Sequence, residues 1–133
     1  PFPWHFGGQS FHNLFVSPNE IKEFCEKNLN VKICLDLSHS MMACNYYGWS
    51  IENFIKEVSK YNIHMHVVDA LGIDGEGVEI GKGDVNFSKF FQLIDEVCPG
   101  TQFIPEIWQG HKNSGEGFWQ ALNYLEKISK EDC

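Results

Sequence analysis

The sequence contains no arginine. All ten cationic residues are lysines, against 18 aspartates and glutamates, and the net charge is −8. Proteins that bind nucleic acid neutralise its phosphates with clustered cations and often read bases with arginine. An acidic surface without arginine repels a polyanion on average, so we do not expect nucleic acid as the main partner.

Long apolar runs are also absent. The apolar stretches are far shorter than the roughly 20 residues that a membrane-spanning helix requires, and no secretory signal opens the chain. We therefore expect no membrane partner. The chain starts at Pro1 without a methionine and runs at once into an aromatic segment, so we interpret it as a fragment of a longer protein.

Paired cysteine motifs are missing as well. The five cysteines are an odd number without a C-x-x-C pair, which predicts neither a disulfide framework nor a zinc knuckle. Such usage is typical of a reducing compartment, and we predict a cytoplasmic protein. With 43% hydrophobic residues in 133 positions, the chain can form one domain with a core.

Short β-branched runs alternate with amphipathic stretches along the chain. Capping residues support two of the helices: Ser17 and Glu20 form a capping box, and Ser50 caps a later helix. A glycine-rich loop at 72–83 follows the second strand. The predicted strands are residues 31–36, 64–68 and 102–107, and the predicted helices are residues 18–27, 50–61, 87–97 and 117–130.

This alternation indicates βαβ units and a parallel sheet. A doubly wound sheet would carry a G-x-G-x-x-G turn after its first strand, and residues 37–42 (LSHSMM) contain none. A TIM barrel fits better, because three strands and four helices are about half of a fold that takes roughly 250 residues. We predict that residues 1–133 form the C-terminal half of a (β/α)8 barrel, with three βα units and a leading helix.

Residue types that bind metals lie at the ends of all three predicted strands. Asp36 ends the first strand and His39 comes shortly after it, His66 belongs to the second strand, and Glu106 lies at the end of the third. Barrel strands bring their carboxyl ends to one mouth, where an inward carboxylate needs a partner and no arginine exists. Taken singly, such an Asp is more often a helix cap and such a His a hydrogen-bonded core residue. Taken together, these carboxylates and imidazoles favour a divalent metal such as Mn²⁺, Zn²⁺ or Co²⁺. We interpret His64, two residues before His66, as a structural residue.

Two glycine-rich loops border the predicted mouth. Backbone N–H groups of residues 72–84 can approach a ligand closely. The loop at 109–117 opens into a helix N-terminus that suits an anion together with Lys82 or Lys112. The alternative is a flexible lid without anion chemistry, because glutamates in these loops disfavour phosphate. His111 in the second loop suits either a ligand or a structural role.

Four motifs carry a resemblance to a known family: Asp36-x-x-His39, His66-x-x-Asp69, Asp74-Gly-Glu-Gly…Ile80-Gly-x-Gly83, and Glu106 on the last strand. They resemble the xylose isomerase-like TIM barrels, which include sugar and sugar-phosphate isomerases and epimerases and the apurinic-site endonucleases. The resemblance covers nearly the whole chain. More narrowly, the stretches LDLSHSMMACNYYGWS, DGEGVEIGKGDVNF and PEIWQGHKNSGEGFWQAL resemble barrel modules found with sialic-acid-type sugar synthases.

This resemblance implies a metal site of Asp36, His66 and Glu106, with His39 as a further ligand or a catalytic contact to substrate. It also implies proton transfer next to a carbonyl through a metal-stabilised enediolate, with Glu106 as the base. Two features depart from the family. Its other metal-bound Glu would lie upstream of Pro1, and its arginine after the His of the penultimate strand is missing here. Asp74 and Glu76 lie near that position instead.

A sugar substrate implies further contacts. Gln9 and Asn13 are predicted to bind hydroxyl groups, and Trp4 and Trp108 to form an apolar wall, with loop packing as the alternative role for the aromatic residues. The remaining predicted substrate contacts are Asp74, Glu76, His111 and Lys112.

Three functions remain in competition. The leading hypothesis is a metal-dependent sugar or sugar-phosphate isomerase or epimerase, active only in the complete barrel. The second is a non-catalytic carbohydrate-binding or assembly module of a sialic-acid-type synthase. An abasic-site endonuclease-like phosphodiesterase is the third, and the acidic surface disfavours it. Half a barrel leaves strand edges open, so we expect pairing with the missing half or self-association.

Overall fold

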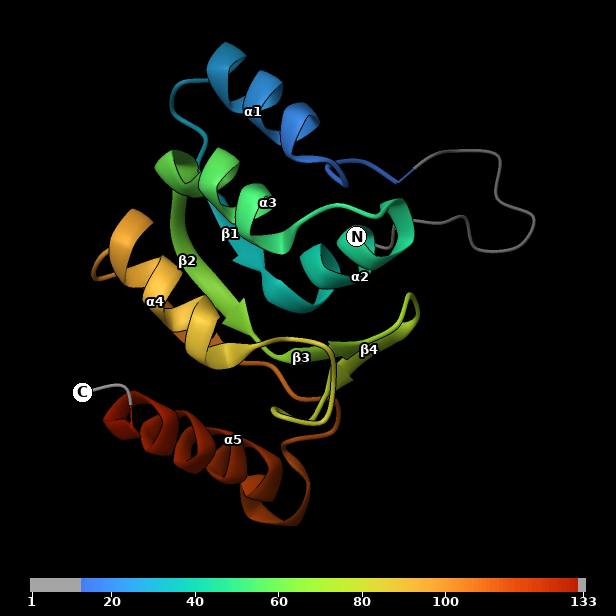
Figure 1. Ribbon diagram of the computed structural model, residues 1–133, viewed down its shortest axis with the longest axis vertical. Coiled ribbons are helices and arrows are strands. Elements are labelled where there is room, and N and C mark those ends of the chain that lie inside the picture. Colours follow the sequence, from blue (N-terminus) through green and yellow to red (C-terminus); the bar gives the residue numbers. More distant parts are fainter. Residues whose placement is uncertain (1–12, 132–133) are drawn as a thin grey trace.

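Three parallel strands lie at the centre of the structure, a computed structural model that describes residues 13–131 (Figure 1). They are β1 (Ile33–Asp36), β2 (Asn62–Val67) and β5 (Gln102–Pro105), in the order β1-β2-β5. Both pairings are parallel, which confirms the predicted parallel sheet. The carboxyl ends of the three strands therefore lie along one edge of the sheet.

Five α-helices occur in the described part of the chain, one more than the sequence predicts. None of these helices has the length and apolar character needed to cross a membrane. They are α1 (Pro18–Lys27), α2 (Leu37–Tyr47), α3 (Ile51–Val58), α4 (Phe87–Val97) and α5 (Lys112–Glu131), with a short 3₁₀ helix, η1 (Ser59–Tyr61), after α3.

The observed bounds of α1 and α4 match the predicted helices at 18–27 and 87–97. Side-chain caps fix both starts: the Ser17 hydroxyl accepts the N–H of Glu20 at 3.2 Å, and the Asn86 side chain accepts that of Lys89 at 3.1 Å. In α5, three residues from Asn113 to Gly115 have positive φ. Regular helix geometry therefore begins close to the predicted start at residue 117.

Helix α2 is missing from the predicted elements. Its buried residues include Leu37, Ser38 and Met42, and this mixture lacks the 3.6-residue period of an amphipathic helix. The helix starts where β1 ends, because an Asp36 carboxylate oxygen accepts the N–H of His39 at 3.0 Å and caps the first turn. This cap holds the Asp36 side chain at the carboxyl edge of the sheet.

The glycine-rich segment after β2 forms an ordered antiparallel hairpin of β3 (Asp69–Leu71) and β4 (Gly75–Val78). The Asp69 carboxylate is fully buried and organises the segment behind the hairpin. It accepts four backbone N–H groups at 2.9 to 3.1 Å, from Ala70, Gly81, Gly83 and Val85. These results correct the prediction of a loop whose glycine N–H groups approach a bound ligand, because two of those groups already bind Asp69.

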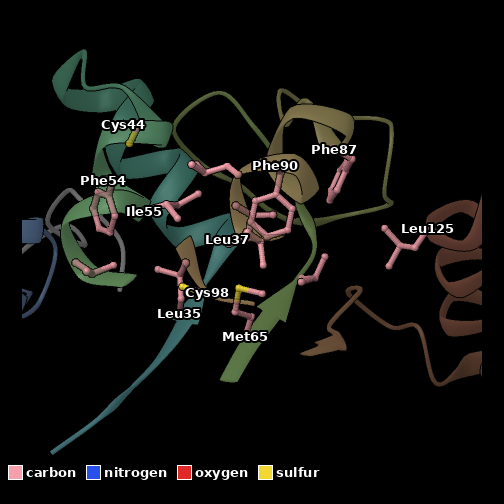
Figure 2. Packing of buried hydrophobic residues seen from close by; sticks show 14 of the residues in the cluster. Leu35, Leu37, Cys44, Phe54, Ile55, Met65, Phe87, Phe90, Cys98 and Leu125 are labelled. Carbon is pink, nitrogen blue, oxygen red and sulfur yellow. The ribbon is translucent and has the colours of Figure 1, made fainter. Parts of the chain in front are cut away.

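One face of the sheet supports the hydrophobic core. Leu35 and Met65 are buried on this face, in one cluster with Phe54 of α3 and Phe90 of α4, and Leu125 of α5 belongs to the same cluster (Figure 2). The helices contact one another in succession: α1 packs on α3, α3 on α4, and α4 on α5. The result is a partial α/β barrel, an arc of helices around a parallel sheet.

The opposite face of the sheet corresponds to the interior of a closed barrel. Side chains alternate between the faces of a strand, so Cys34 and Asp36 lie on this face next to His64 and His66 of the neighbouring strand. Cys34 is exposed and the other three residues are half-buried. The polar residues of the three parallel strands are thus gathered on the accessible side of the sheet.

Candidate metal centre

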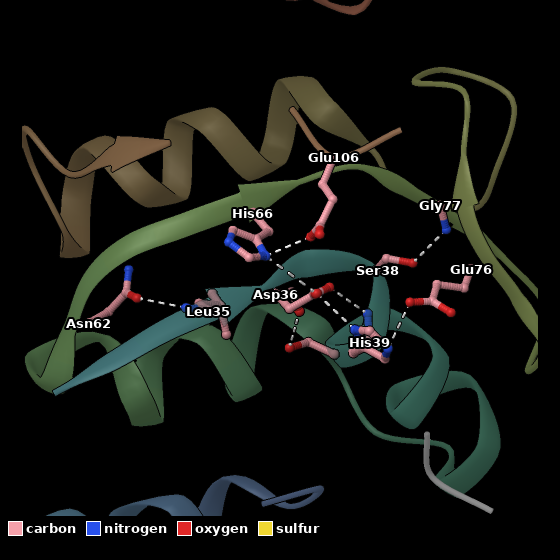
Figure 3. A network of polar contacts seen from close by, with 10 residues as sticks. Leu35, Asp36, Ser38, His39, Asn62, His66, Glu76, Gly77 and Glu106 are labelled. Carbon is pink, nitrogen blue, oxygen red and sulfur yellow. Dashed lines mark hydrogen bonds and ion pairs between the residues drawn. The ribbon is translucent and has the colours of Figure 1, made fainter. Parts of the chain in front are cut away.

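Asp36, His66 and Glu106 form a compact group at the carboxyl edge of the sheet (Figure 3). One potential ligand atom from each residue lies within 4.8 Å of the other two. Nδ1 of His66 is 2.6 Å from a Glu106 carboxylate oxygen and 3.8 Å from one of Asp36. The two carboxylates therefore converge on a single imidazole.

Strand register brings these three residues together. Asp36 and His66 are direct partners in the β1–β2 pairing. Glu106 follows the last residue of β5, and its N–H donates to the carbonyl of Val67 at 3.4 Å. Each residue thus stands at or just beyond the end of a different strand, as the sequence predicts for a barrel mouth.

The Asp36 carboxylate is held in its charged form. Burial favours the neutral acid, but hydrogen bonds from the ring and backbone of His39 and the charges of His39 and His66 outweigh it, and the pKa of Asp36 lies below its ordinary value. Nδ1 of His39 is 2.8 Å from Oδ2 of Asp36, the same oxygen that faces His66. An anionic, oriented carboxylate suits a metal ligand.

His39 does not belong to the group of three. Its Nδ1 contacts Asp36, and its Nε2 is 3.1 Å from a carboxylate oxygen of Glu76. Both ring nitrogens therefore face carboxylates (Figure 3). This geometry lets His39 orient Asp36, and its role as a metal ligand or catalytic residue stays a prediction.

The donor set fits a divalent cation. Two carboxylates and one imidazole match the preferences of Mn²⁺, Co²⁺ and Zn²⁺, whereas Ca²⁺ prefers oxygen ligands alone. Glu106 keeps 54% of its side chain exposed, so the group remains open to a ligand from solvent. The residues present therefore fit the predicted metal.

A polar pocket of about 530 Å³ lies beside this group, within the size range of small-molecule sites. It includes three of the predicted substrate contacts, Glu76, Trp108 and Lys112, together with Glu79 and Glu116. The backbone N–H of Trp108 donates to the carbonyl of Gly77 at 3.0 Å, which joins the loop after β5 to the hairpin. Since Glu76 also contacts His39, the pocket adjoins the metal group.

The other predicted contacts lie elsewhere. Asp74 and His111 are exposed and do not line this pocket, and Asn13 is half-buried ahead of α1 and does not line it either. Trp4 and Gln9 lie outside the described residues. Lys112 donates to the side chain of Gln109 at 2.8 Å and remains exposed at the pocket.

Comparisons with known proteins identify the family and the fold of this chain. The family model described as xylose isomerase-like TIM barrel matches residues 2–128. An uncharacterized protein of Methanocaldococcus jannaschii is 38% identical over 86 residues, which cover 65% of this chain and 32% of that protein.

Two solved structures share the fold. A xylose isomerase domain protein from Planctomyces limnophilus superposes with a TM-score of 0.69 at 22% identity, over 93% of this chain and 48% of that one. A D-tagatose 3-epimerase-like protein gives a TM-score of 0.68 at 19% identity, over 97% of this chain and 46% of that one. The chain thus spans less than half the length of these relatives.

Proposed function

Because the chain belongs to the xylose isomerase-like TIM barrel family, we propose that it is the metal-binding, C-terminal half of a sugar or sugar-phosphate isomerase or epimerase. The observation that carries this proposal is the convergence of Asp36, His66 and Glu106 within 4.8 Å at the carboxyl edge of a parallel sheet. Active sites of barrel enzymes lie at this edge. The similarity to a D-tagatose 3-epimerase-like protein supports the fold that this function requires.

In this proposal Asp36, His66 and Glu106 hold a divalent cation, Mn²⁺, Co²⁺ or Zn²⁺. When bound, such a cation polarises the sugar carbonyl and stabilises negative charge on its oxygen. Glu106 is the base that removes the proton from the carbon next to the carbonyl and returns it. Its exposed carboxylate can reach a substrate at the mouth, and His39 keeps Asp36 charged and oriented.

The substrate proposed for the adjoining pocket is a small sugar or its phosphate. Trp108, which is 73% exposed, offers an apolar surface to a sugar ring. Glu76 accepts hydrogen bonds from hydroxyl groups, and Lys112 supplies a positive charge for a phosphate.

Metal binding tests this proposal on the chain itself. Calorimetric titration with Mn²⁺, a cation that prefers carboxylates, is expected to show specific binding to the wild type and its loss in Asp36→Asn, His66→Ala and Glu106→Gln. The matched control is Glu116→Gln, which removes an exposed pocket carboxylate and leaves binding unchanged. Full Mn²⁺ occupancy in all three site variants would overturn the proposal.

Turnover is tested in the longer protein that a half-barrel implies. Incubation with ketoses and Mn²⁺ in deuterated water should exchange the proton next to the carbonyl, as followed by NMR, and Glu106→Gln should abolish this exchange. Sugar binding without exchange, with metal present, would instead favour a non-catalytic carbohydrate-binding module.

A further inference from the structure

A second group of metal-ligating residues lies one layer deeper in the sheet. Cys34, His64 and His66 each offer a ligand atom within 4.8 Å of the other two. Cys34 and His64 are direct partners in the β1–β2 register, and His66 follows two residues after His64 on the same face. The group is built entirely from two adjacent strands, so its spacing is fixed by the sheet.

The chemistry of this group differs from that of the carboxylate group above it. A thiolate and two imidazoles are softer ligands, of the kind that bind Zn²⁺ and Co²⁺ in tetrahedral sites. Mn²⁺ prefers oxygen ligands and would avoid such a set. Zn²⁺ and Co²⁺ suit both groups, whereas Mn²⁺ suits only the carboxylate group and so distinguishes the two.

His66 belongs to both groups and has two ring nitrogens. Nδ1 faces Glu106 and Asp36, and Figure 3 shows the second nitrogen on the opposite side of the ring. The rings of His64 and His66 stand nearly perpendicular, with centroids 6.0 Å apart. The imidazole of His66 thus has a second ring nitrogen besides the one that faces the two carboxylates.

Solvent reaches the deeper group. Cys34 is exposed, whereas Cys25, Cys44 and Cys98 are buried. Cys34 also lines a pocket of about 300 Å³ next to β1 and α1. An ion can therefore reach this thiol without unfolding of the chain.

We propose that Cys34, His64 and His66 form a second metal site, for Zn²⁺ or Co²⁺, with a fourth coordination position open to water or a small ligand. This site shares only His66 with the metal group of the proposed isomerase function and requires neither Asp36 nor Glu106. The family resemblance assigns no role to Cys34 or His64.

Cobalt absorption tests the site. Co²⁺ is titrated into the reduced, full-length chain without oxygen, and the near-ultraviolet thiolate-to-cobalt charge-transfer band is recorded. We expect the wild type to show this band and to lose it when Zn²⁺ is added. We expect Cys34→Ser and His64→Ala not to show the band. It is expected to persist in Glu106→Gln and in the cysteine control Cys98→Ala.

Alkylation of the wild type provides a measurement that needs no variant. Zn²⁺ should slow the reaction of Cys34 with iodoacetamide, followed by peptide mass spectrometry, while Mg²⁺ should leave its rate unchanged. Absence of the cobalt band from the wild type, its persistence in Cys34→Ser, or equal alkylation rates with and without Zn²⁺ would each overturn the proposal. Loss of Mn²⁺ binding alone would count against the isomerase function and leave this site intact.

Discussion

At the scale of single residues, His39 determines how Asp36 is presented. Its ring and backbone both bind that carboxylate, and its other nitrogen faces Glu76. We predict that His39→Ala weakens Mn²⁺ binding by about 10- to 100-fold, the usual cost of losing a residue that orients a ligand. Calorimetric titration measures this change, with His111→Ala as the exposed control. A loss as complete as in Asp36→Asn would instead make His39 a ligand.

The thiol of Cys44 makes stability depend on alkaline pH. Burial, with a smaller contribution from the charge of Glu52, raises the pKa of Cys44 from 9.0 to about 12. The folded state therefore holds the thiol proton of Cys44 more tightly than the unfolded state does. The stability that this protonated thiol contributes is complete below pH 9 and is lost as the pH rises towards 12.

We therefore predict that, above pH 9, the free energy of unfolding falls less steeply with pH in Cys44→Ala than in the wild type. The difference between the two slopes is at most about 1.4 kcal/mol per pH unit. Urea unfolding of both proteins at about pH 8 and about pH 10 measures the difference in slope. Identical slopes in wild type and Cys44→Ala would show that this thiol is not the source.

At the scale of elements, the hairpin β3–β4 and the segment behind it depend on Asp69. This buried carboxylate accepts four backbone N–H groups, and an amide at this position would present a donor to some of them. We predict that Asp69→Asn lowers the free energy of unfolding by about 2–4 kcal/mol. Urea unfolding checks this value, with Asp74→Asn as the exposed control expected within about 0.5 kcal/mol of wild type. Equal stability of the two variants would contradict the prediction.

Elements with local signals were predictable from the sequence, and those defined by tertiary context were not. Helices α1 and α4 combine a side-chain cap with an amphipathic period, so their bounds match. Helix α2 lacks that period because it is buried around much of its surface. The hairpin was missed because its glycine-rich strands do not alternate, and the segment between β4 and α4 is organised by a contact distant in sequence, between Asp69 and Gly83.

The candidate site follows the same rule. Asp36, His66 and Glu106 were identified because parallel strands must bring their carboxyl ends to one edge. The position of His39 was not predicted, because it depends on the first turn of α2, a helix that the sequence did not reveal, and on Glu76 of the hairpin. Cys34 and His64 were on the predicted inner face, but only the β1–β2 register places them side by side.

At the scale of the whole molecule, the sheet formed by residues 13–131 has β1 and β5 as its edge strands and one accessible face. Ile104 on that face is 47% exposed and is the β5 partner of His66. Open strand edges and exposed apolar side chains favour association with a further copy or with another part of a barrel.

We predict that the isolated chain forms dimers in a concentration-dependent manner, and that Ile104→Lys shifts it towards the monomer by placing a charge on the face that a second copy would cover. Native mass spectrometry and sedimentation at several concentrations measure this equilibrium. Leu29→Lys changes a side chain that is 81% exposed in the loop between α1 and β1 and serves as the matched control with unchanged association. A wild-type chain that stays monomeric at all concentrations, or a dimer unaffected by Ile104→Lys, would show that this face of the half-barrel is stable without a partner.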